Sequence, residues 1–205
     1  MTQSKFTIYG DSRSGNCYKI QLLCAELEIE YDWHEVDILA RDTHTPEFLA
    51  MNANGKIPLL VLPDGRCLPE SNAILYYLAE DSELFAGDTY SRANILSWMC
   101  FEQYSHEPNI ATSRFIIQYL GNPADKLATL AEKKPAGIKA LDIMEQQLNR
   151  NDYITGETYN ISDIALFAYT HVAEEGGFSL DPYPGIRAWI ERIMQRPKFV
   201  AITQK

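Results

Sequence analysis

The chain has 205 residues, of which 46% are hydrophobic, and it carries a formal net charge of −10 at pH 7. This length suits one large domain or two small ones with a substantial core. Acidic residues outnumber basic ones by 28 to 18 and no basic run occurs, which argues against a nucleic-acid partner because phosphate binding needs clustered Lys and Arg.

Membrane-spanning and secretory segments are not expected either. No stretch approaches the roughly 20 apolar residues of a spanning helix, and the start "MTQSKFTIYG" lacks the apolar core of a signal peptide. We therefore expect a cytoplasmic location and no membrane partner. The cysteines have neither C-x-x-C pairing nor histidines at ligand spacing, so we expect reduced thiols and no metal site at Cys17, Cys24, Cys67 and Cys100.

The first 80 residues alternate strand and helix patterns. "KFTIYG" predicts a strand at 5–10, and apolar residues recur at helical spacing from Gly15. "YDWHEVDI" predicts a second strand at 31–38, which the intervening helix would place parallel to the first. The remaining expected elements are a helix at 45–52, a hairpin at 57–70 and a helix at 70–80. This order, β-α-β-α-β-β-α, is that of a thioredoxin-like domain.

The pattern changes near residues 81–90, which we interpret as a linker. Amphipathic segments follow with Gly and Pro punctuation and no convincing strand, so we expect an all-helical domain over 91–205. The clearest helical segments are 92–107, 131–150, 160–176 and 183–197. At the start of the third, Asn160 and Asp163 have the spacing of a capping box, which indicates a structural role.

The junction between the first strand and the first helix holds the tetrad Ser14-Gly15-Asn16-Cys17. A serine at a helix start has a plain explanation as an N-cap residue. Read as a redox motif, the tetrad has its second cysteine but a serine in place of the first. A second stretch, "NGKIPLLVLPDGRCLPESNAILYYLAE", matches the pattern of another functional loop.

Four motifs in the same order, "NGKIPLL", "LPESNAILYYLAE", "NISDIALFAYTH" and "PGIRAWIERIMQRPKF", resemble signatures of the cytosolic glutathione S-transferase family. The resemblance covers essentially the full chain and looks bacterial, with a serine-type active-site loop. It implies a thioredoxin-like domain near 1–80 that binds glutathione, a helical domain that supplies most of a second-substrate pocket, and a homodimer. The implied activity is conjugation of glutathione, as co-substrate, to a small hydrophobic electrophile, with no metal.

The resemblance also implies the glutathione contacts. Ile57-Pro58 would be a cis peptide whose Ile57 backbone pairs with the cysteinyl part of glutathione. Glu70 would take the α-ammonium of the γ-glutamyl end, while Ser71 and the helix amides take its α-carboxylate. His44 and Lys56 occupy positions that often reach the glycyl carboxylate, although either suits a solvated surface, and Ser71 can also act as a cap.

The thiol of glutathione needs activation, since a free thiol with a pKa near 8.5 is mostly protonated at pH 7. A hydroxyl donor and a helix N-terminus both favour the thiolate. We expect Ser14 to provide the hydroxyl, with Asn16 as the second candidate and Ser12 or Cys17 behind them. Tyr9 at the end of the first strand is expected to pack beneath the site.

Cys17 leaves an alternative open. A thiol near a helix N-terminus can form a mixed disulfide with glutathione, which would favour reduction of disulfides or peroxides. Because Cys17 and Cys24 lie seven apart on one helix face, core packing is the simpler interpretation. A third hypothesis is a non-catalytic binding protein on the same fold.

The stretch "WMCFEQYSHEPNIATSRF" in the helical half is unusually polar for a core helix. In the family this helix lines the dimer interface and the active-site cleft, so the resemblance implies that Glu102 reaches the glutathione of the partner subunit. It also implies that Tyr104, His106 and Arg114 line the second-substrate pocket. The alternative for all four is a solvated helix face.

Overall fold

The computed structural model describes residues 5–202, and they divide into two compact units. The first unit runs to Ser82 and also takes in the chain from Lys198; the second is Glu83–Pro197. Residues 1–4 and 203–205, which the sequence analysis placed at the ends of the two expected domains, lie outside the described residues.

The segment from Lys198 to Ile202 was expected in the helical domain but belongs to the first unit. The Tyr18 hydroxyl donates to the Val200 carbonyl at 2.6 Å, and the Lys198 ammonium donates to the Glu26 carbonyl at 3.1 Å. Helical spacing does not predict these contacts, because they depend on where the last segment meets α1.

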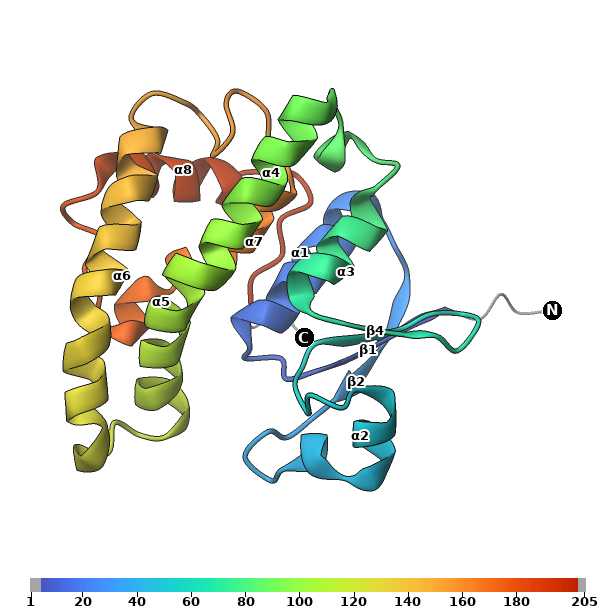
Figure 1. Ribbon diagram of the computed structural model, residues 1–205. Coiled ribbons are helices and arrows are strands. Elements are labelled where there is room, and N and C mark those ends of the chain that lie inside the picture. Colours follow the sequence, from blue (N-terminus) through green and yellow to red (C-terminus); the bar gives the residue numbers. More distant parts are fainter. Residues whose placement is uncertain (1–4, 203–205) are drawn as a thin grey trace. The chain divides into compact units, whose positions relative to one another are not determined.

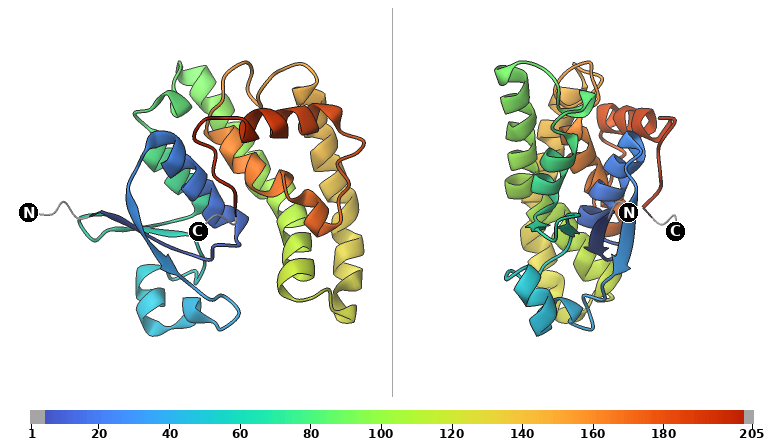
Figure 2. Two further views of the ribbon diagram at one scale, coloured as in Figure 1. Left: turned by 180° about the vertical axis from the view of Figure 1, so that it is seen from behind. Right: turned by 90° about the vertical axis from the view of Figure 1, so that its right-hand side faces the viewer.

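A mixed four-stranded sheet in the order β2-β1-β3-β4 forms the centre of the first unit. β1 pairs in parallel with β2 and antiparallel with β3, and β3 and β4 form the hairpin. Helices α1 and α3 cover one face of this sheet and α2 the other (Figures 1 and 2). The elements are β1 Phe6–Gly10, α1 Gly15–Leu27, β2 Tyr31–Glu35, η1 Asp42–His44, α2 Pro46–Met51, β3 Leu59–Val61, β4 Cys67–Pro69 and α3 Ser71–Ala79. The thioredoxin-like prediction is confirmed.

β2 ends at Glu35, three residues before the predicted end of the strand at Ile38. Asp37 explains the early end, because its carboxylate accepts hydrogen bonds from the backbone amides of Leu39 and Ala40 at 2.9 and 3.0 Å. A carboxylate that satisfies its own local amides turns the chain away from the ladder.

The second unit is helical, as predicted. Among its described residues the only β feature is an isolated bridge between Tyr153 and Gly156. Its elements are η2 Glu83–Phe85, α4 Thr89–Phe101, η3 Glu102–His106, α5 Glu107–Arg114, η4 Phe115–Tyr119, η5 Ala124–Lys126, α6 Leu127–Leu148, α7 Ile161–Thr170, η6 Ala173–Gly176 and α8 Pro184–Met194.

The predicted helix at 92–107 is longer and less regular than its spacing indicates. α4 passes into the π-helical turn η3, then into α5 and a second π-helical turn, η4. Pro108 lies at the start of α5, where its ring would clash with a regular α-helical turn before it. The π-helical turn η3 lies directly before this position, so the irregular turn and the proline coincide.

α7 is the buried centre of the second unit, with every residue from Ile161 to Thr170 buried. Its N-terminus is closed by the predicted capping box: the Asn160 side chain accepts from Ser162 N at 3.0 Å, and Asp163 Oδ2 accepts from Asn160 N at 3.0 Å. The structural interpretation of this motif is confirmed.

Candidate functional site

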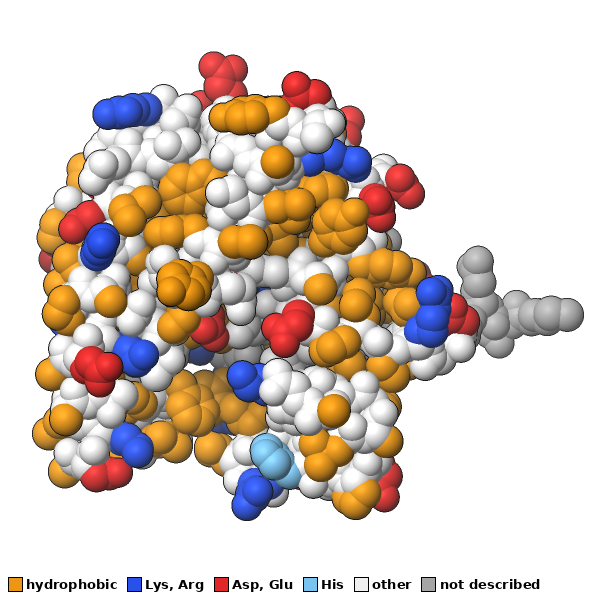
Figure 3. Space-filling view, in the orientation of Figure 1, with side chains coloured by type: hydrophobic (Ala, Val, Ile, Leu, Met, Phe, Trp, Pro, Cys, Tyr) orange, Lys and Arg blue, Asp and Glu red, His pale blue; other side chains and the backbone are white. Residues whose placement is uncertain are grey.

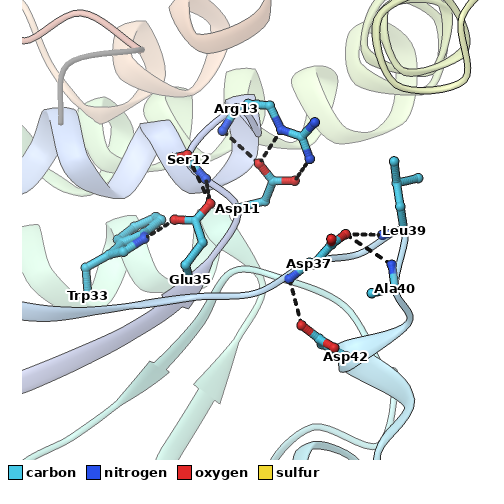
Figure 4. A network of polar contacts seen from close by, with 9 residues as sticks. All are labelled: Asp11, Ser12, Arg13, Trp33, Glu35, Asp37, Leu39, Ala40 and Asp42. Carbon is cyan, nitrogen blue, oxygen red and sulfur yellow. Dashed lines mark hydrogen bonds and ion pairs between the residues drawn. The ribbon is translucent and has the colours of Figure 1, made fainter.

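The loop between β1 and α1 is held in shape by its own charged side chains. Asp11 is almost fully buried, and its carboxylate accepts from the Arg13 backbone amide at 2.8 Å and pairs with the Arg13 guanidinium at 2.9 Å (Figure 4). The Asp11 carbonyl accepts from Ser14 N at 2.9 Å. These bonds fix the path of the backbone into α1, so the position of Ser14 is set by residues before it.

Ser12 is bound to a different carboxylate. Glu35 at the end of β2 accepts from both the Ser12 amide and the Ser12 hydroxyl at 3.0 Å, and from Trp33 Nε1 at 2.6 Å (Figure 4). A hydroxyl that already donates to a carboxylate is a poor donor to a second anion. This contact weighs against Ser12 as the partner of a ligand thiol.

Ser14 lies at the N-cap position of α1 but does not cap the helix with its side chain. The Ser14 side chain lowers the pKa of the Cys17 thiol, an effect smaller than that of burial. Ser14 is half-buried, whereas Cys17 is fully buried. Burial raises the pKa of the Cys17 thiol to about 12, so this group stays protonated at neutral pH and is a weak nucleophile.

Gly10 allows the close packing behind this loop. A Cβ at Gly10 would stand 2.7 Å from the Trp33 ring and 2.9 Å from Cys17 Sγ. Tyr9, one residue earlier, packs against the His34 ring at 4.5 Å and the edge of Phe48 at 6.3 Å. Tyr9 therefore lies among ring contacts, in keeping with the packing role expected for it.

The start of α3 meets the start of α1 through a polar network. Ser71, which is buried, donates from its hydroxyl to Asn16 Oδ1 at 3.2 Å. The Lys19 ammonium donates to Ser71 Oγ at 3.2 Å and to Asn72 Oδ1 at 3.3 Å. The structure thus brings together Asn16 and Ser71, two residues that the sequence placed 55 positions apart in one candidate site.

Two members of this network, Lys19 and Asn72, were not predicted as site residues. The available signal was a lysine among the apolar positions of α1, between Tyr18 and Ile20. A lysine in such a position commonly extends its ammonium to solvent, so the sequence alone does not distinguish a buried lysine from an exposed one. In the structure Lys19 is fully buried.

Glu70 lies at the N-cap of α3 with an exposed side chain and an unusual backbone. Its φ of 74° and ψ of 115° are disfavoured for a residue with a side chain, and its carboxylate makes no capping bond. Such strain is concentrated at functional sites because the surrounding structure must hold it. The conformation leaves the first amides of α3 without a Glu70 side-chain cap.

Ile57-Pro58 is a cis peptide, as the resemblance implied. Near it, Gly55 has a φ of 60°, and a Cβ there would stand 3.2 Å from the Thr43 carbonyl and 3.7 Å from the His44 ring. The close approach at Gly55 brings the exposed His44 next to the residue that precedes exposed Lys56. Two side chains predicted for one carboxylate therefore lie in neighbouring loops.

The four site residues predicted in the helical unit differ in how far they are exposed to solvent. Tyr104 is 88% exposed, whereas Glu102 and His106 are fully buried and Arg114 nearly so. Gln103 Nε2 donates to Glu102 at 2.9 Å, His106 Nε2 lies 2.9 Å from Thr170 Oγ1, and Arg114 Nε donates to Glu175 at 2.6 Å. The predicted solvated helix face is therefore limited to Tyr104 among these four.

Residues 5–202 contain no group of three or more His, Cys, Asp or Glu side chains placed to hold a metal ion, and no helix in this range is long and apolar enough to cross a bilayer. The cysteines within it are all free thiols. On the face in view in Figure 3, basic side chains are scattered among acidic ones without forming a continuous basic patch.

Comparison with known proteins defines the class of protein. Residues 13–81 match the family model for the N-terminal domain of glutathione S-transferases, and residues 108–197 match the model for their C-terminal domain. The disulfide-bond oxidoreductase YfcG of Escherichia coli is 31% identical over 191 residues, which cover 89% of this chain and 87% of YfcG. The chain belongs to the glutathione S-transferase family.

Solved structures agree with this assignment. A glutathione S-transferase from Pseudomonas fluorescens superposes with a TM-score of 0.96 at 52% identity, covering 98% of this chain and all of the other. A second family member from the same species, crystallised with two glutathione bound, has a TM-score of 0.83 at 26% identity and covers 97% of this chain and 92% of its own.

Proposed function

We propose that this protein is a glutathione transferase that binds glutathione on its first unit and adds the glutathione thiolate to a small hydrophobic electrophile. The observation that carries the proposal is the meeting of two helix N-termini, where Ser71 Oγ lies 3.2 Å from Asn16 Oδ1. Neither α1 nor α3 is capped by the side chain of its N-cap residue. Amides at both helix starts therefore face one polar region, which suits an anionic ligand.

The γ-glutamyl end of glutathione would bind at α3. Its α-carboxylate would accept from the Ser71 hydroxyl and the first amides of the helix, and its α-ammonium would pair with Glu70. The Ile57 backbone would pair with the cysteinyl part. The exposed cations of Lys56 and, when protonated, His44 suit the glycyl carboxylate.

The thiol would bind near the start of α1. The half-buried Ser14 hydroxyl and the positive end of the helix would both stabilise a thiolate. Each unit by which the pKa falls requires roughly 1.4 kcal/mol of preferential stabilisation, and one charge-assisted hydrogen bond supplies roughly 1.5 to 3 kcal/mol. Asn16 is the second candidate, although its Oδ1 faces Ser71, so its amide group must reach the sulfur from the other side.

Calorimetry with glutathione, followed by an assay with an aryl halide as model electrophile, tests this proposal. We expect heat of binding at millimolar ligand or below and formation of the glutathione conjugate. No heat of binding at millimolar glutathione would contradict both steps. Binding with neither conjugation of a model electrophile nor reduction of a model disulfide would support a non-catalytic binding protein instead.

A second candidate activity is disulfide reduction, favoured by the 31% identity with the disulfide-bond oxidoreductase YfcG. Two glutathione molecules would reduce one disulfide to two thiols and form one glutathione disulfide, so both attacking thiolates come from glutathione. The burial of Cys17 and the high pKa of its thiol argue against an enzyme thiol in this exchange. Steady release of glutathione disulfide during turnover would identify this reaction.

We also propose the dimer and the remaining site residues from the family resemblance. Leu96 and Cys100 lie one turn apart on α4 and are exposed in the single chain, and this apolar face suits a second copy. Sedimentation is expected to give a species of twice 23.3 kDa at micromolar concentration, and a species of 23.3 kDa would refute the dimer.

The roles of the other helical-unit residues remain predictions. The exposure of Tyr104 supports a contact with the electrophile. The burial of His106 and Arg114 favours a structural role for them, in which they stabilise the packing of the helices near Tyr104. Glu102 would have to be uncovered to reach the glutathione of a partner subunit. We propose a cytoplasmic location because the chemistry needs reduced glutathione, which a reducing compartment maintains.

A further inference from the structure

Lys19 carries a buried charge that packing alone does not require. Its side chain is fully buried in α1 between Tyr18 and Ile20, which are also fully buried. Its ammonium contacts the first turn of α3 at Ser71 Oγ and Asn72 Oδ1. An apolar side chain of similar length would avoid the desolvation of an ammonium, so the charge points to a role beyond filling space.

The chemistry of these contacts fixes the direction of each hydrogen bond. An ammonium has donors and no acceptor, so Ser71 Oγ must accept from Lys19. The single proton of the Ser71 hydroxyl is therefore donated elsewhere, and in the structure it is donated to Asn16 Oδ1 at 3.2 Å. Lys19 therefore orients the Ser71 hydroxyl so that its proton points away from the Lys19 ammonium and can be donated to another group.

We propose that Lys19 is a positioning residue for the α-carboxylate of glutathione and acts on it through Ser71. This inference rests on the proposed function, in which Ser71 receives that carboxylate. The Ser71 proton can then turn from the neutral oxygen of Asn16 to a charged oxygen, which is a stronger acceptor. Held as a donor toward that oxygen, the Ser71 hydroxyl favours ligands that carry a carboxylate at this position.

Two ligands separate this role from a general effect on the fold. One is glutathione, and the other is γ-aminobutyryl-cysteinyl-glycine, which is glutathione without the α-carboxylate. We expect the wild-type protein to bind glutathione about 10- to 100-fold more tightly in calorimetry. Lys19→Met is expected to reduce this ratio several-fold, because the Ser71 hydroxyl loses its orientation while the α3 amides remain, and to leave the affinity for the analogue unchanged. The matched control is Lys5→Met, which removes a surface ammonium paired with Glu30 and should preserve the ratio.

A double variant tests whether Lys19 acts through Ser71. In a Ser71→Ala background, Lys19→Met should add little to the loss of glutathione affinity, because the hydroxyl that it orients is gone. Fully additive losses, or equal loss of both ligands in Lys19→Met, would overturn the proposal. If Lys19→Met does not give a cooperative unfolding transition, Lys19→Gln serves in its place, because its shorter uncharged side chain does not reach Ser71 and should give the same ligand-selective loss.

The wild-type protein separates this inference from the proposed function. A wild type that binds neither ligand contradicts the proposed function, and the role of Lys19 falls with it. A wild type that binds glutathione with an unchanged preference in Lys19→Met contradicts only the role of Lys19.

Discussion

The start of α7 and the starts of α1 and α3 satisfy their backbone amides in opposite ways. At α7, Asn160 and Asp163 cap the helix, and Asp163 also accepts from Ile154 N at 2.8 Å and Trp189 Nε1 at 2.9 Å. At α1 and α3, the N-cap residues Ser14 and Glu70 make no side-chain capping bond. A helix start whose first amides already donate to its own side chains has fewer amides left for a ligand, whereas one left open can bind an anion.

The closed start should respond to mutation through stability alone. Asp163→Ala leaves several buried donors without their acceptor, and we expect a loss of about 3 to 5 kcal/mol in the free energy of unfolding. Denaturant unfolding measures this loss, with exposed Asp181→Ala as the control. The glutathione affinity of the folded variant should be unchanged. A loss of affinity without a loss of stability would contradict the purely structural role of the α7 start.

A half-buried histidine directly after α7 should make the second unit sensitive to acid. Burial lowers the pKa of His171 to about 4, while its Nδ1 donates to the Phe167 carbonyl at 2.7 Å. Protonation therefore favours the unfolded chain, and up to about 3 kcal/mol of stability is present above pH 6.5 and lost as the pH falls toward 4.

Comparison with His171→Gln isolates this loss. Burial raises the pKa of Asp163 to about 6, so that group acts in the opposite direction: its contribution is present at low pH and is lost as the pH rises through about 6. Because both proteins keep Asp163, their difference in unfolding free energy between pH 7 and pH 4.5 reports His171, to within about 1 kcal/mol. A parallel pH dependence in the two proteins would show that His171 is not the acid-sensitive group.

The open start of α3 should show the reverse pattern, with affinity lost and stability kept. Glu70→Ala is expected to raise the Kd of glutathione about 30-fold, which corresponds to about 2 kcal/mol, because the α-ammonium loses its carboxylate. Glutaryl-cysteinyl-glycine, which lacks that ammonium, should bind both proteins equally. Glu70→Gly should also lose affinity. Its free energy of unfolding should nevertheless be about 1 kcal/mol higher than that of the wild type, since glycine relieves the strain of the positive φ. Unchanged glutathione affinity would remove Glu70 from the site.

The sequence predicted what depends on local pattern. The strand and helix order of the first unit, the capping box at Asn160 and the cis Ile57-Pro58 peptide all follow from nearby residues or from the family motifs. The π-helical turn before Pro108 and the end of β2 at Glu35 were missed, because each depends on backbone geometry that several residues set together.

The candidate site was predictable in part for the same reason. Ser14, Asn16 and Ser71 occupy helix starts that periodicity locates. Lys19 was missed because a lysine in an apolar run looks like a surface residue until its contact with α3 is known. The burial of His106 and Arg114 was missed because the packing of several helices decides it.

Titration of the bound glutathione thiol tests most directly whether Ser14 stabilises the thiolate. The ultraviolet absorbance of the glutathione thiolate, taken as the difference between loaded and unloaded protein, gives its pKa in wild type, Ser14→Ala and Ser12→Ala. The Cys17 thiol, with a pKa of about 12, stays outside the titrated range.

We expect the bound thiol to titrate about 1 to 2 units below its usual pKa in the wild type and in Ser12→Ala, whose hydroxyl is bound to Glu35. Ser14→Ala should raise that pKa toward the value of free glutathione. An unaltered titration in Ser14→Ala would contradict the role of Ser14 and assign the thiolate to Asn16.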